Sequence, residues 1–326
     1  MKFPGIAIIV LHYKNLSDTR ECLKSLQKID YPNYCVILVN NDSAEHGEKL
    51  QVEFGDFIIL VQNKKNLGFA EGNNVGLRSA LADKNVDAVF LLNNDTEVEP
   101  DILTELSRTP ADMVAPRMIR FDYRDKIDNL GIVLMSSGLP FNRTNENQKL
   151  FCPSGGAALY SRKLLEAVAT PSFTKEGGGG WWFDPLFFAY CEDLDLGWRA
   201  RLAGFEAAYT TKAIVYHKGS AATSKMSDFA VYHTYRNLLW TQFKNLPAPL
   251  LLWQSPWLGL GWFFIFFLYL FKGRSGVILR ALWDGMMGLH FVLNHRQQVQ
   301  RNRKATQKQI LSWFTNGLFP RNLLKK

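Results

Sequence analysis

The chain has 326 residues, of which 47% are hydrophobic and 21% charged, and this composition excludes a wholly disordered protein. Its four cysteines are far apart, which excludes the paired spacings of zinc fingers and redox motifs. The net charge of +8 is uneven, because residues 272–326 hold eleven lysines and arginines against one acid.

Short apolar runs alternate with helical patterns over the first hundred residues. The runs are rich in Val and Ile, as strands buried on both faces require, and they lie at Ile6–Tyr13, Cys35–Asn41, Phe57–Asn63 and Ala88–Asn94. Ser17 is a candidate N-cap for a helix between the first two runs, and a second helix is expected from about Ala70 to Ala82. The alternation predicts an α/β fold with a mostly parallel sheet.

Polar residues collect where the predicted strands end. They are His12 and Tyr13, then Asn41 and Asp42, then Asn93, Asn94 and Asp95. Open parallel sheets bind ligands at the carboxyl ends of their strands, so one shared site is expected there. Carboxylate and amide oxygens suit a hard cation, although Asn-Asn-Asp is also ordinary turn composition.

A glycine-containing stretch, NLGFAEGNN, places Gly68 and Gly72 where a loop enters a helix, with Asn73 directly after them. This arrangement allows backbone N–H groups to approach phosphate oxygens, although the glycines can equally shape a plain loop. No G-x-G-x-x-G follows the first strand and no P-loop pattern is present. These absences argue against a dinucleotide oxidoreductase and a P-loop ATPase.

The middle of the chain, from Met113 to about Lys218, predicts mixed strands and loops. CEDLDLGWRARLAGF begins a helix with acids in its first turn, and Gly204 is expected at its C-terminal cap. In EGGGGWWFDP, the glycines could give a mobile cover on which Trp181 and Trp182 stack against a sugar or nucleobase. A plain surface loop fits these letters equally well.

Past Leu246 the composition changes, and we expect two regions, residues 1–245 and residues 246–326. Pro247–Phe271 is almost free of charge and is long enough for a bilayer core of ~30 Å. Pro256 leaves only Trp257–Phe271 as an unbroken apolar run, so we expect attachment within the membrane interface. A membrane span and a buried core helix are the alternatives.

The basic tail favours an anionic membrane surface, and a solvated amphipathic tail is the alternative. Nucleic acid is not expected as a partner, because it would gain nothing from the adjacent apolar segment. The N-terminal stretch has an early Pro4-Gly5 break and no small-residue cleavage site, so a secretory signal is not expected. The cysteines fit a reducing compartment, although two disulfides in an exported protein remain open.

Seven segments, taken in order, resemble the inverting glycosyltransferases of family 2, particularly the rhamnosyltransferase-like branch of bacterial polysaccharide synthesis. They are IVLHYKN, VNNDS, NLGFAEGNN, LLNNDTEV, PSGGAALYSRK, FFAYCEDLDLGWRARLAGF and VYHKGS, and they span about Ile6 to Ser220. The resemblance implies a GT-A fold, in which a nucleotide-binding parallel sheet joins an acceptor-binding half. It also implies a nucleotide-sugar donor.

The resemblance implies a divalent metal, Mg²⁺ or Mn²⁺, bound by Asp95, Asn93 and His217. Asn93-Asn94-Asp95 matches the family's D-x-D motif, but Asn93 replaces the first acid. Metal affinity would therefore rest chiefly on Asp95, and Asn93 would be free to reach the ribose. The residues expected around nucleotide and acceptor are His12, Tyr13, Asp42, Gly68, Asn73, Asn93, Asn94, Gly155 and Gly156.

Glu192 and Asp193 match the family's catalytic E-D pair. An inverting transfer needs one carboxylate to remove the proton of the acceptor hydroxyl. The family pattern assigns this base to Asp193, with Glu192 as the alternative. Acids in the first turn also offset the helix macrodipole, by ~0.3–1 kcal/mol each.

The expected function is transfer of a sugar, for example rhamnose from dTDP-rhamnose, to a saccharide carried on a polyprenyl diphosphate lipid. The expected location is the cytoplasm, peripherally on the cytoplasmic face of the inner membrane. A nucleotidyltransferase or related sugar-nucleotide enzyme is one alternative. A non-catalytic carbohydrate-binding module is the other.

Overall fold

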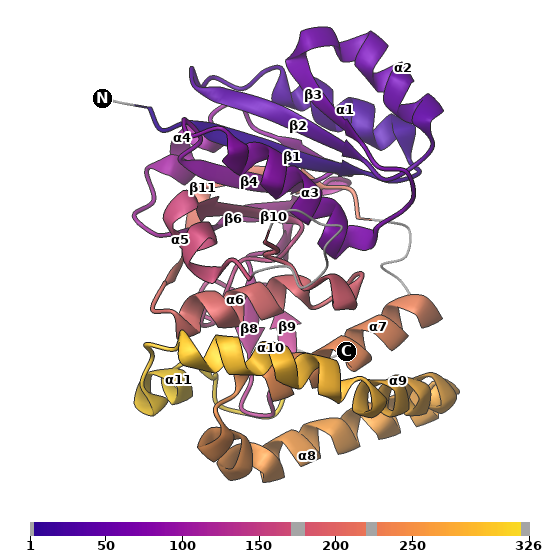
Figure 1. Cartoon of the computed structure of the whole chain (residues 1–326), viewed down its shortest axis with the longest axis vertical. Helices are drawn as coiled ribbons and strands as arrows, with labels where there is room; N and C mark the ends of the chain where they lie inside the picture. The colour runs from indigo at the N-terminus through magenta and orange to yellow at the C-terminus, as the bar shows by residue number, and fades with distance from the viewer. Residues whose placement is uncertain (1–2, 171–179, 220–226, 321–326) are drawn as a thin grey trace.

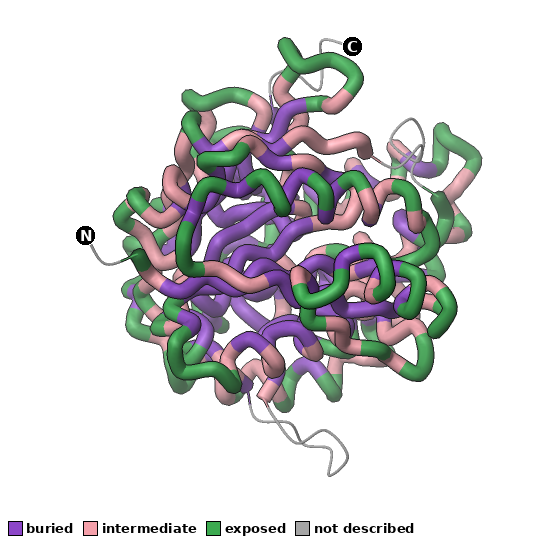
Figure 2. The backbone as a smooth tube through the Cα atoms, turned by 90° about the horizontal axis from the view of Figure 1, so that it is seen from above, coloured by how far each residue is buried: buried purple, intermediate pink, exposed green. Residues whose placement is uncertain are grey.

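The computed structural model describes residues 3–170, 180–219 and 227–320 (Figure 1). Its centre is a nine-stranded sheet in which the order is β3-β2-β1-β4-β10-β6-β11-β5, with β7 paired to β6. These strands are β1 (Ile6–His12), β2 (Tyr34–Asn40), β3 (Ile58–Gln62), β4 (Ala88–Asn93), β5 (Thr96–Val98), β6 (Met113–Arg120), β7 (Tyr123–Asn129), β10 (Ala157–Ser161) and β11 (Ala207–His217). Figure 2 shows the buried backbone gathered in the interior of the molecule.

The N-terminal half of the sheet is parallel: β1 pairs with β2 and with β4, and β2 pairs with β3. β10 is reversed and joins β4 to β6, while β11 runs parallel to β6. The expected α/β fold with a mostly parallel sheet is therefore confirmed. Each of the four predicted strands is present, with its ends displaced by at most one residue.

Helices cover both faces of the sheet. They are α1 (Leu16–Leu26), α2 (Ala44–Phe54), α3 (Gly68–Ala82), α4 (Ile102–Ser107), α5 (Arg162–Val168) and α6 (Glu192–Leu202), with 3₁₀ turns η1 (Gly55–Phe57) and η2 (Pro185–Phe187). Because side chains alternate along a strand, Ile8 of β1 packs in one cluster with Leu23 of α1. Its neighbour Ile9 packs in the opposite cluster with Leu77 of α3.

Two expected helix ends can be compared with the structure. The N-cap of α1 is Asn15, whose side chain accepts the N–H of Asp18, so the expectation that Ser17 would be the cap is wrong. Leu16 is already helical, which places Ser17 inside the first turn. Gly204, with φ +94°, directly follows Ala203 at the end of α6, as expected for a left-handed position that favours glycine.

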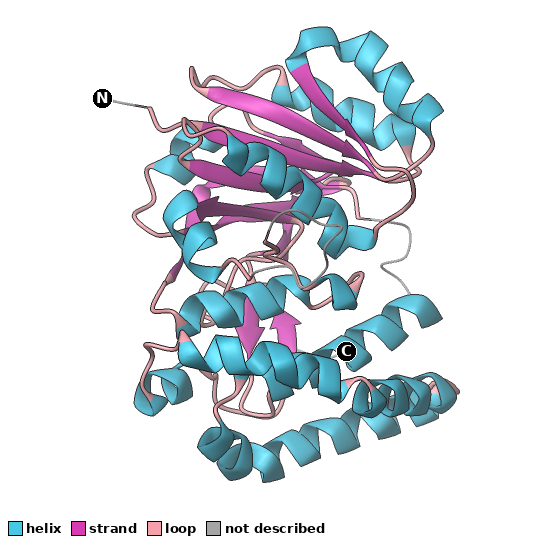
Figure 3. Ribbon diagram, viewed as in Figure 1, coloured by secondary structure: helices cyan, strands magenta, loops and turns pink. Residues whose placement is uncertain are grey.

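A helical layer lies at the end of the molecule opposite α1 and α2 (Figures 1 and 3). It contains α7 (Asp228–Asn245), α8 (Ala248–Phe271), α9 (Ser275–Met287), α10 (Leu289–Arg301) and α11 (Gln307–Trp313). The hairpin of β8 (Ile132–Leu134) and β9 (Pro140–Asn142) lies beside this layer. The expected boundary after residue 245 coincides with the end of α7.

Helix α8 continues through Pro256, so the unbroken apolar run Trp257–Phe271 is only the second part of a longer helix. A proline lacks the N–H that would bond the carbonyl four residues earlier, here that of Leu252. The hydroxyl of Ser255 donates to this carbonyl at 2.8 Å and replaces the missing partner. Among the described residues, α8 is the one helix long and apolar enough to cross a membrane, and 28% of its apolar stretch is buried.

Helix α8 has two different apolar faces. Its buried positions recur every three or four residues, at Leu250, Gln254, Leu258, Gly261, Ile265 and Tyr269. We call the opposite side, together with the exposed side of α9, the apolar face; it consists of Leu252, Trp253, Trp257, Leu260, Phe263, Phe267, Leu270, Phe271, Leu279, Trp283, Met286 and Met287. Helix α8 is therefore packed on the protein along one stripe and exposes large apolar side chains along the other.

Candidate active site

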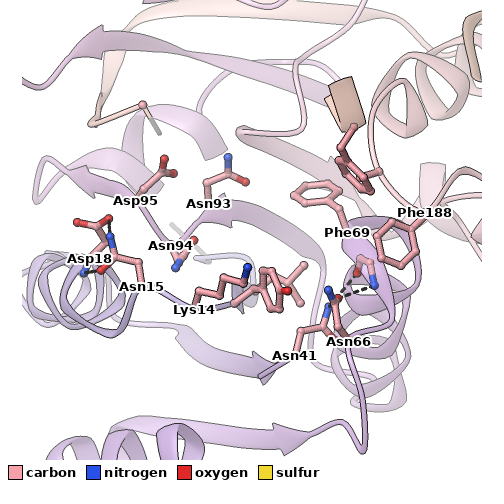
Figure 4. A pocket seen from close by; sticks show the side chains of 16 residues that line it. Lys14, Asn15, Asp18, Asn41, Asn66, Phe69, Asn93, Asn94, Asp95 and Phe188 are labelled. Carbon is pink, nitrogen blue, oxygen red and sulfur yellow. Dashed lines mark hydrogen bonds between the residues drawn. The ribbon is translucent and has the colours of Figure 1, made fainter. Parts of the chain in front are cut away.

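A cavity of about 790 Å³ opens at the carboxyl ends of β1, β2 and β4 (Figure 4). We call it the first cavity. Its walls include Tyr13, Asn41, Gly68, Asn93, Asn94 and Asp95. Polar residues from three strand ends thus meet at one hollow, as open parallel sheets generally arrange them.

A second cavity, of about 400 Å³, adjoins the first. Its walls include Asp128, Gly155, Gly156, Glu192, Asp193 and His217. Phe69, Asn93, Ala189 and Phe229 line both cavities. The side chains expected to bind nucleotide and those expected to act on the acceptor therefore border two connected hollows, with Asn93 between them.

Asp95 and His217 form the part of the site best suited to a divalent cation. His217 Nε2 lies 3.4 Å from Asp95 Oδ1, and His217 Nδ1 lies 2.8 Å from Asp128 Oδ2. Histidines that bind metals commonly donate their other ring N–H to a carboxylate, which fixes the ring. The donor set of one carboxylate and one oriented imidazole, with the amide of Asn93 nearby, fits Mn²⁺ better than Mg²⁺, because Mg²⁺ prefers oxygen ligands alone.

The charge state of His217 follows from the same neighbours. Burial lowers the pKa of His217, but the hydrogen bonds and charges of Asp128 and Asp95 outweigh burial and raise it to about 10. The imidazole is therefore a cation here and neutralises part of the negative charge of the two aspartates. A bound divalent cation would take over that role, because its charge displaces the proton.

Asp128 was missed by the sequence analysis. It lies 89 residues before His217 in the chain, near the end of β7, and no motif or spacing links the two. Lys14 was missed as well, although it follows a predicted strand and lines the first cavity. Its φ of +67° turns its backbone N–H toward Asp42 Oδ2, at 2.9 Å.

The expected nucleotide-binding residues divide into those that line the first cavity and those that support it. Gly68 lines the cavity and has φ +78°, and a Cβ there would lie 2.5 Å from the carbonyl oxygen of Phe188, so this position requires glycine. Asn41 Nδ2 donates to the Gly68 carbonyl at 2.9 Å. Asn73 is buried and its Nδ2 donates to the carbonyl of Phe69 at 2.9 Å, so it holds the first turn of α3.

His12 is fully buried and lies behind the first cavity. It contacts Asp42 and His46, and these three residues form a group whose nitrogen and oxygen atoms lie within 4.8 Å of one another. Asp42 is partly exposed next to Lys14, at the rim of the cavity. Of the three residues expected near the nucleobase, Asp42 and the cavity-lining Tyr13 are accessible, whereas His12 is not.

Asp193 and Glu192 begin α6 and have different surroundings. Asp193 Oδ2 accepts the N–H of Gly155 and Oδ1 accepts the N–H of Leu194, both at 2.7 Å. Burial raises the pKa of Asp193, and these N–H groups oppose the increase. Glu192 is buried, its Oε2 has no hydrogen-bond partner within the described part of the chain, and burial with the nearby Asp193 raises its pKa well above the ordinary value. Asp193 is thus the carboxylate that ionises more readily.

Backbone strain is concentrated around the two cavities. The described residues other than glycine with positive φ are Lys14, Phe188, Tyr190 and Cys191. Lys14 and Phe188 line the first cavity, Tyr190 lines the second, and Cys191 precedes Glu192. Left-handed backbone is costly for such residues and tends to occur at functional sites.

The expectation that Trp181 and Trp182 stack on a sugar or nucleobase is wrong. Both side chains are buried, at 5% and 6% exposure. Trp182 Nε1 donates to the carbonyl of Leu165 at 2.9 Å, and Trp181 packs against His295 of α10. Four glycines were expected to form a mobile cover. Three of them, at positions 177–179, lie outside the described residues. The fourth is Gly180, where a Cβ would lie 3.0 Å from the carbonyl oxygen of Thr170.

Residues 7–169, half of the chain, match the sequence profile of glycosyl transferase family 2. The matched residues include both the strand-end cluster and the Gly155-Gly156 loop. A low-salt glycan biosynthesis hexosyltransferase, Agl10 of Haloferax volcanii, is 22% identical over 243 residues, which cover 71% of this chain and 73% of that protein.

Two solved structures show the fold. A mannosyltransferase from Pyrobaculum calidifontis, in complex with GDP-Man and Mn²⁺, has a TM-score of 0.53 at 15% identity, covering 92% of this chain and 88% of that one. S. aureus TarS residues 1–349, in complex with UDP-GlcNAc, has a TM-score of 0.55 at 15% identity, covering 91% and 89%. The expected GT-A fold is confirmed by this likeness, which extends over the helical layer as well as the sheet.

Proposed function

The chain belongs to glycosyl transferase family 2 and is a glycosyltransferase; from this premise we propose that the first cavity binds the nucleotide-sugar donor and the second binds the acceptor. The observation that carries the proposal is the shared wall at Asn93, with Asp95 on one side and Asp193 on the other. A donor lying along the strand ends would present its sugar at this wall. The acceptor hydroxyl would approach from the second cavity.

The reaction proposed here is an inverting transfer. The acceptor hydroxyl attacks the anomeric carbon on the face opposite the nucleotide, and Asp193 takes its proton as the new C–O bond forms. The bond between the anomeric carbon and the diphosphate oxygen breaks, and the nucleoside diphosphate leaves with the electron pair. Glu192 is the alternative base, but its uncharged form is favoured by burial.

The leaving diphosphate gains negative charge, and the first cavity offers several groups to meet it. Asp95 and His217 would hold a divalent cation, which supplies Lewis-acid stabilisation when bound. Lys14 adds a positive charge to the cavity wall. We propose that Asp42 recognises the nucleobase and that Asn93 contacts the ribose, as the family pattern implies.

We further propose that rhamnose, carried on dTDP, is the donor and that the acceptor is a saccharide on a polyprenyl diphosphate lipid. The apolar face supports a membrane-bound acceptor, because contiguous exposed apolar side chains of this kind mark protein or membrane contact sites. An enzyme bound to the bilayer surface meets a lipid-linked acceptor at high local concentration. The basic residues of 272–326 would favour an anionic surface.

The Asp193→Asn variant tests the function. We expect transfer to fall by ~10²–10⁴-fold, as loss of a general base does, while donor binding stays unchanged. Donors are first identified by thermal stabilisation of the full chain against a panel of nucleotide sugars. Asp125→Asn, an exposed acid of β7, is the control and should retain activity.

Two outcomes would contradict the proposal. If no nucleotide sugar stabilises the protein, the first cavity is not a donor site. If Asp193→Asn transfers sugar at the rate of the Asp125→Asn control, the base is elsewhere. A nucleotidyltransferase would instead consume a nucleoside triphosphate and release pyrophosphate. Nucleoside triphosphates can be tested in the same panel.

A further inference from the structure

A cluster of two histidines and one aspartate lies next to the first cavity; the aspartate is Asp42, proposed above to recognise the nucleobase, and the two histidines have no part in the proposed transfer step. His12 ends β1, Asp42 follows β2, and His46 lies in the first turn of α2. His46 Nδ1 is 3.0 Å from Asp42 Oδ2 and 3.2 Å from His12 Nε2, and His12 Nε2 is 3.9 Å from Asp42 Oδ2. Three potential ligand atoms from three different elements therefore face a common centre.

The hydrogen bonds of Thr19 define the tautomer of His12. The Thr19 hydroxyl has one proton, which it donates to the carbonyl of Asn15 at 3.1 Å, and it accepts the Nδ2–H of Asn94 at 2.9 Å. His12 Nδ1 lies 2.7 Å from the same oxygen, and with the Thr19 proton directed at the Asn15 carbonyl it is the donor in that contact. The proton of a neutral His12 is thus on Nδ1, and the lone pair of Nε2 points into the cluster.

The cluster has fewer protons than its acceptor atoms need for hydrogen bonds. The lone pair of His12 Nε2 and the Asp42 carboxylate both face His46 Nδ1, which carries at most one proton. A neutral imidazole with its lone pair directed at a carboxylate and a second imidazole is the form that binds metals.

We propose that His12, Asp42 and His46 form a second metal site, separate from the Asp95–His217 pair, and that it binds a borderline divalent ion such as Zn²⁺. Two imidazole nitrogens and one carboxylate oxygen are a common zinc donor set. Zinc–ligand bonds of ~2.0–2.2 Å in a tetrahedron place the ligand atoms roughly 3.3–3.6 Å apart. The three separations of 3.0, 3.2 and 3.9 Å bracket this range, so small side-chain movements suffice.

The surrounding contacts match what such a site needs. The Thr19 hydroxyl fixes the ring of His12 from the outside, as the outer hydrogen-bond partners of metal-binding histidines do. Asp42 Oδ2 also accepts the N–H of Lys14 at 2.9 Å. A bound ion would therefore tie together β1, the end of β2 and the start of α2, and would fix the Lys14 backbone at the rim of the first cavity. Oδ1 of Asp42 would remain for another ligand.

The test uses the full chain carrying Asp95→Ala, which removes the other metal site, after treatment with a chelator. Co²⁺ is titrated and followed by visible absorption, and Zn²⁺ is titrated by calorimetry. We expect one equivalent of Co²⁺ with the absorption of a tetrahedral ion, displaced by Zn²⁺. Far-ultraviolet circular dichroism establishes that each variant is folded.

Three further substitutions, each added to the Asp95→Ala protein, are compared for their effect on Zn²⁺ binding. His46→Ala, at a partly exposed position, should weaken Zn²⁺ binding by more than ~100-fold, beyond the effect of losing an outer partner. Thr19→Val should weaken it by ~10–100-fold. His290→Ala, an exposed histidine of α10, should leave it unchanged.

The proposal is overturned if the Asp95→Ala protein binds no Co²⁺ or Zn²⁺. It is also overturned if folded His46→Ala binds Zn²⁺ as tightly as His290→Ala, because the binding would then be adventitious. Neither result bears on donor binding or on transfer by the unmodified chain, so failure of this site is distinguishable from failure of the proposed function.

Discussion

Glu192 is a carboxyl group that the fold buries without a partner for one of its oxygens among the described residues. Its raised pKa has a consequence for stability. The folded protein keeps the Glu192 proton at pH values where the unfolded chain, with an ordinary glutamate pKa of ~4.3, releases it. The free energy of unfolding therefore falls as pH rises through that interval, because the unfolded state binds fewer protons.

We predict that Glu192→Gln stabilises the protein, and that the gain is larger at pH 8 than at pH 4.5. Each unit by which the pKa is raised corresponds to about 1.4 kcal/mol. Urea unfolding at the two pH values measures the gain. Glu48→Gln, at an exposed position of α2, is the control and should show no pH-dependent gain. An equal effect of Glu192→Gln at both pH values would show that the carboxyl group ionises normally.

Asp128 acts on the proposed cation site through the ring of His217. Losing the carboxylate that orients a metal-binding histidine typically weakens metal affinity by ~10–100-fold. We predict this loss of Mn²⁺ affinity for Asp128→Asn, in a His46→Ala background that removes the other cluster. The free Mn²⁺ signal in electron paramagnetic resonance measures it.

Asp125→Asn, on the same strand, is the matched control for this measurement. If Asp128→Asn and Asp125→Asn bind Mn²⁺ equally well, then His217 is not oriented by Asp128 for metal binding. The result would leave Asp95 as the principal ligand.

At the scale of elements, α7 is fixed to the helix that begins with the proposed catalytic pair. Lys244 of α7 is fully buried, and its Nζ lies 2.7 Å from Asp184 Oδ2 and 3.0 Å from Asp195 Oδ2. His295 of α10 contacts the same oxygen of Asp184 at 2.8 Å. Burial raises the pKa of Asp184, but Lys244 and His295 outweigh it and hold the pKa below the ordinary value. This contribution to stability is present at neutral pH and is lost as the pH falls.

We predict that Lys244→Met lowers the free energy of unfolding by about 3–5 kcal/mol, because it removes the buried cation that Asp184 and Asp195 share and leaves His295 and Arg199 as their remaining salt-bridge partners. Urea unfolding at pH 7 measures the change. Lys308→Met, at an exposed position of α11, should stay within about 0.5 kcal/mol of the unmodified protein. Similar stabilities for the two variants would mean that the buried charges are compensated by other groups.

The elements of the N-terminal half were predictable from sequence because burial on both faces gives strands an unmistakable apolar run. The accuracy of Ile6–His12 and Ala88–Asn93 follows from this. The site was predictable only where polar residues directly follow those strands. Asp128 joins it because β6 pairs both with β7 and with the distant β11, which carries His217, and no local pattern encodes the pairing with β11.

Local composition also misled in two places. Trp181 and Trp182 follow a glycine run, and their burial depends on α5, whose Leu165 lies 17 residues before Trp182, and on α10, which is distant in sequence. Pro256 limits the unbroken apolar run to Trp257–Phe271, whereas the helix itself continues through Pro256, where the hydroxyl of Ser255 donates to the carbonyl that the proline leaves without a donor. In both cases the deciding hydrogen bond is made to a backbone carbonyl, that of Leu165 or Leu252, whose position in the fold the letters do not specify.

At the scale of the whole molecule, residues 246–320 are packed on the rest of the protein. Trp313 of α11 lies with its ring centroid 5.9 Å from that of Trp198 in α6. The N–H of Thr315 donates to the carbonyl of Leu134 at 2.7 Å. Removing this region would uncover buried surface of α6, so membrane binding is better tested by substitutions on the apolar face.

We predict that Phe271→Asp weakens binding to anionic phospholipid vesicles by about 10-fold or more, since burying a phenylalanine contributes ~1.5–3 kcal/mol. Co-sedimentation with vesicles measures the change. Val52→Asp is a matched control, because Val52 on α2 and Phe271 on α8 are both 86% exposed. If both variants lose binding equally, or neither does, the apolar face is not the membrane contact.

Strand β10 runs against its neighbours β4 and β6. Because β10 is antiparallel to β4, β10 begins at the edge of the sheet where β4 ends. The contact is direct, since the Asn93 N–H donates to the Gly156 carbonyl at 2.9 Å, and Gly155 in turn donates to Asp193. This single reversal of direction places the second cavity beside the first. The bond between Asn93 and Gly156 joins two backbone atoms, so substitution of a side chain at the shared wall leaves it in place.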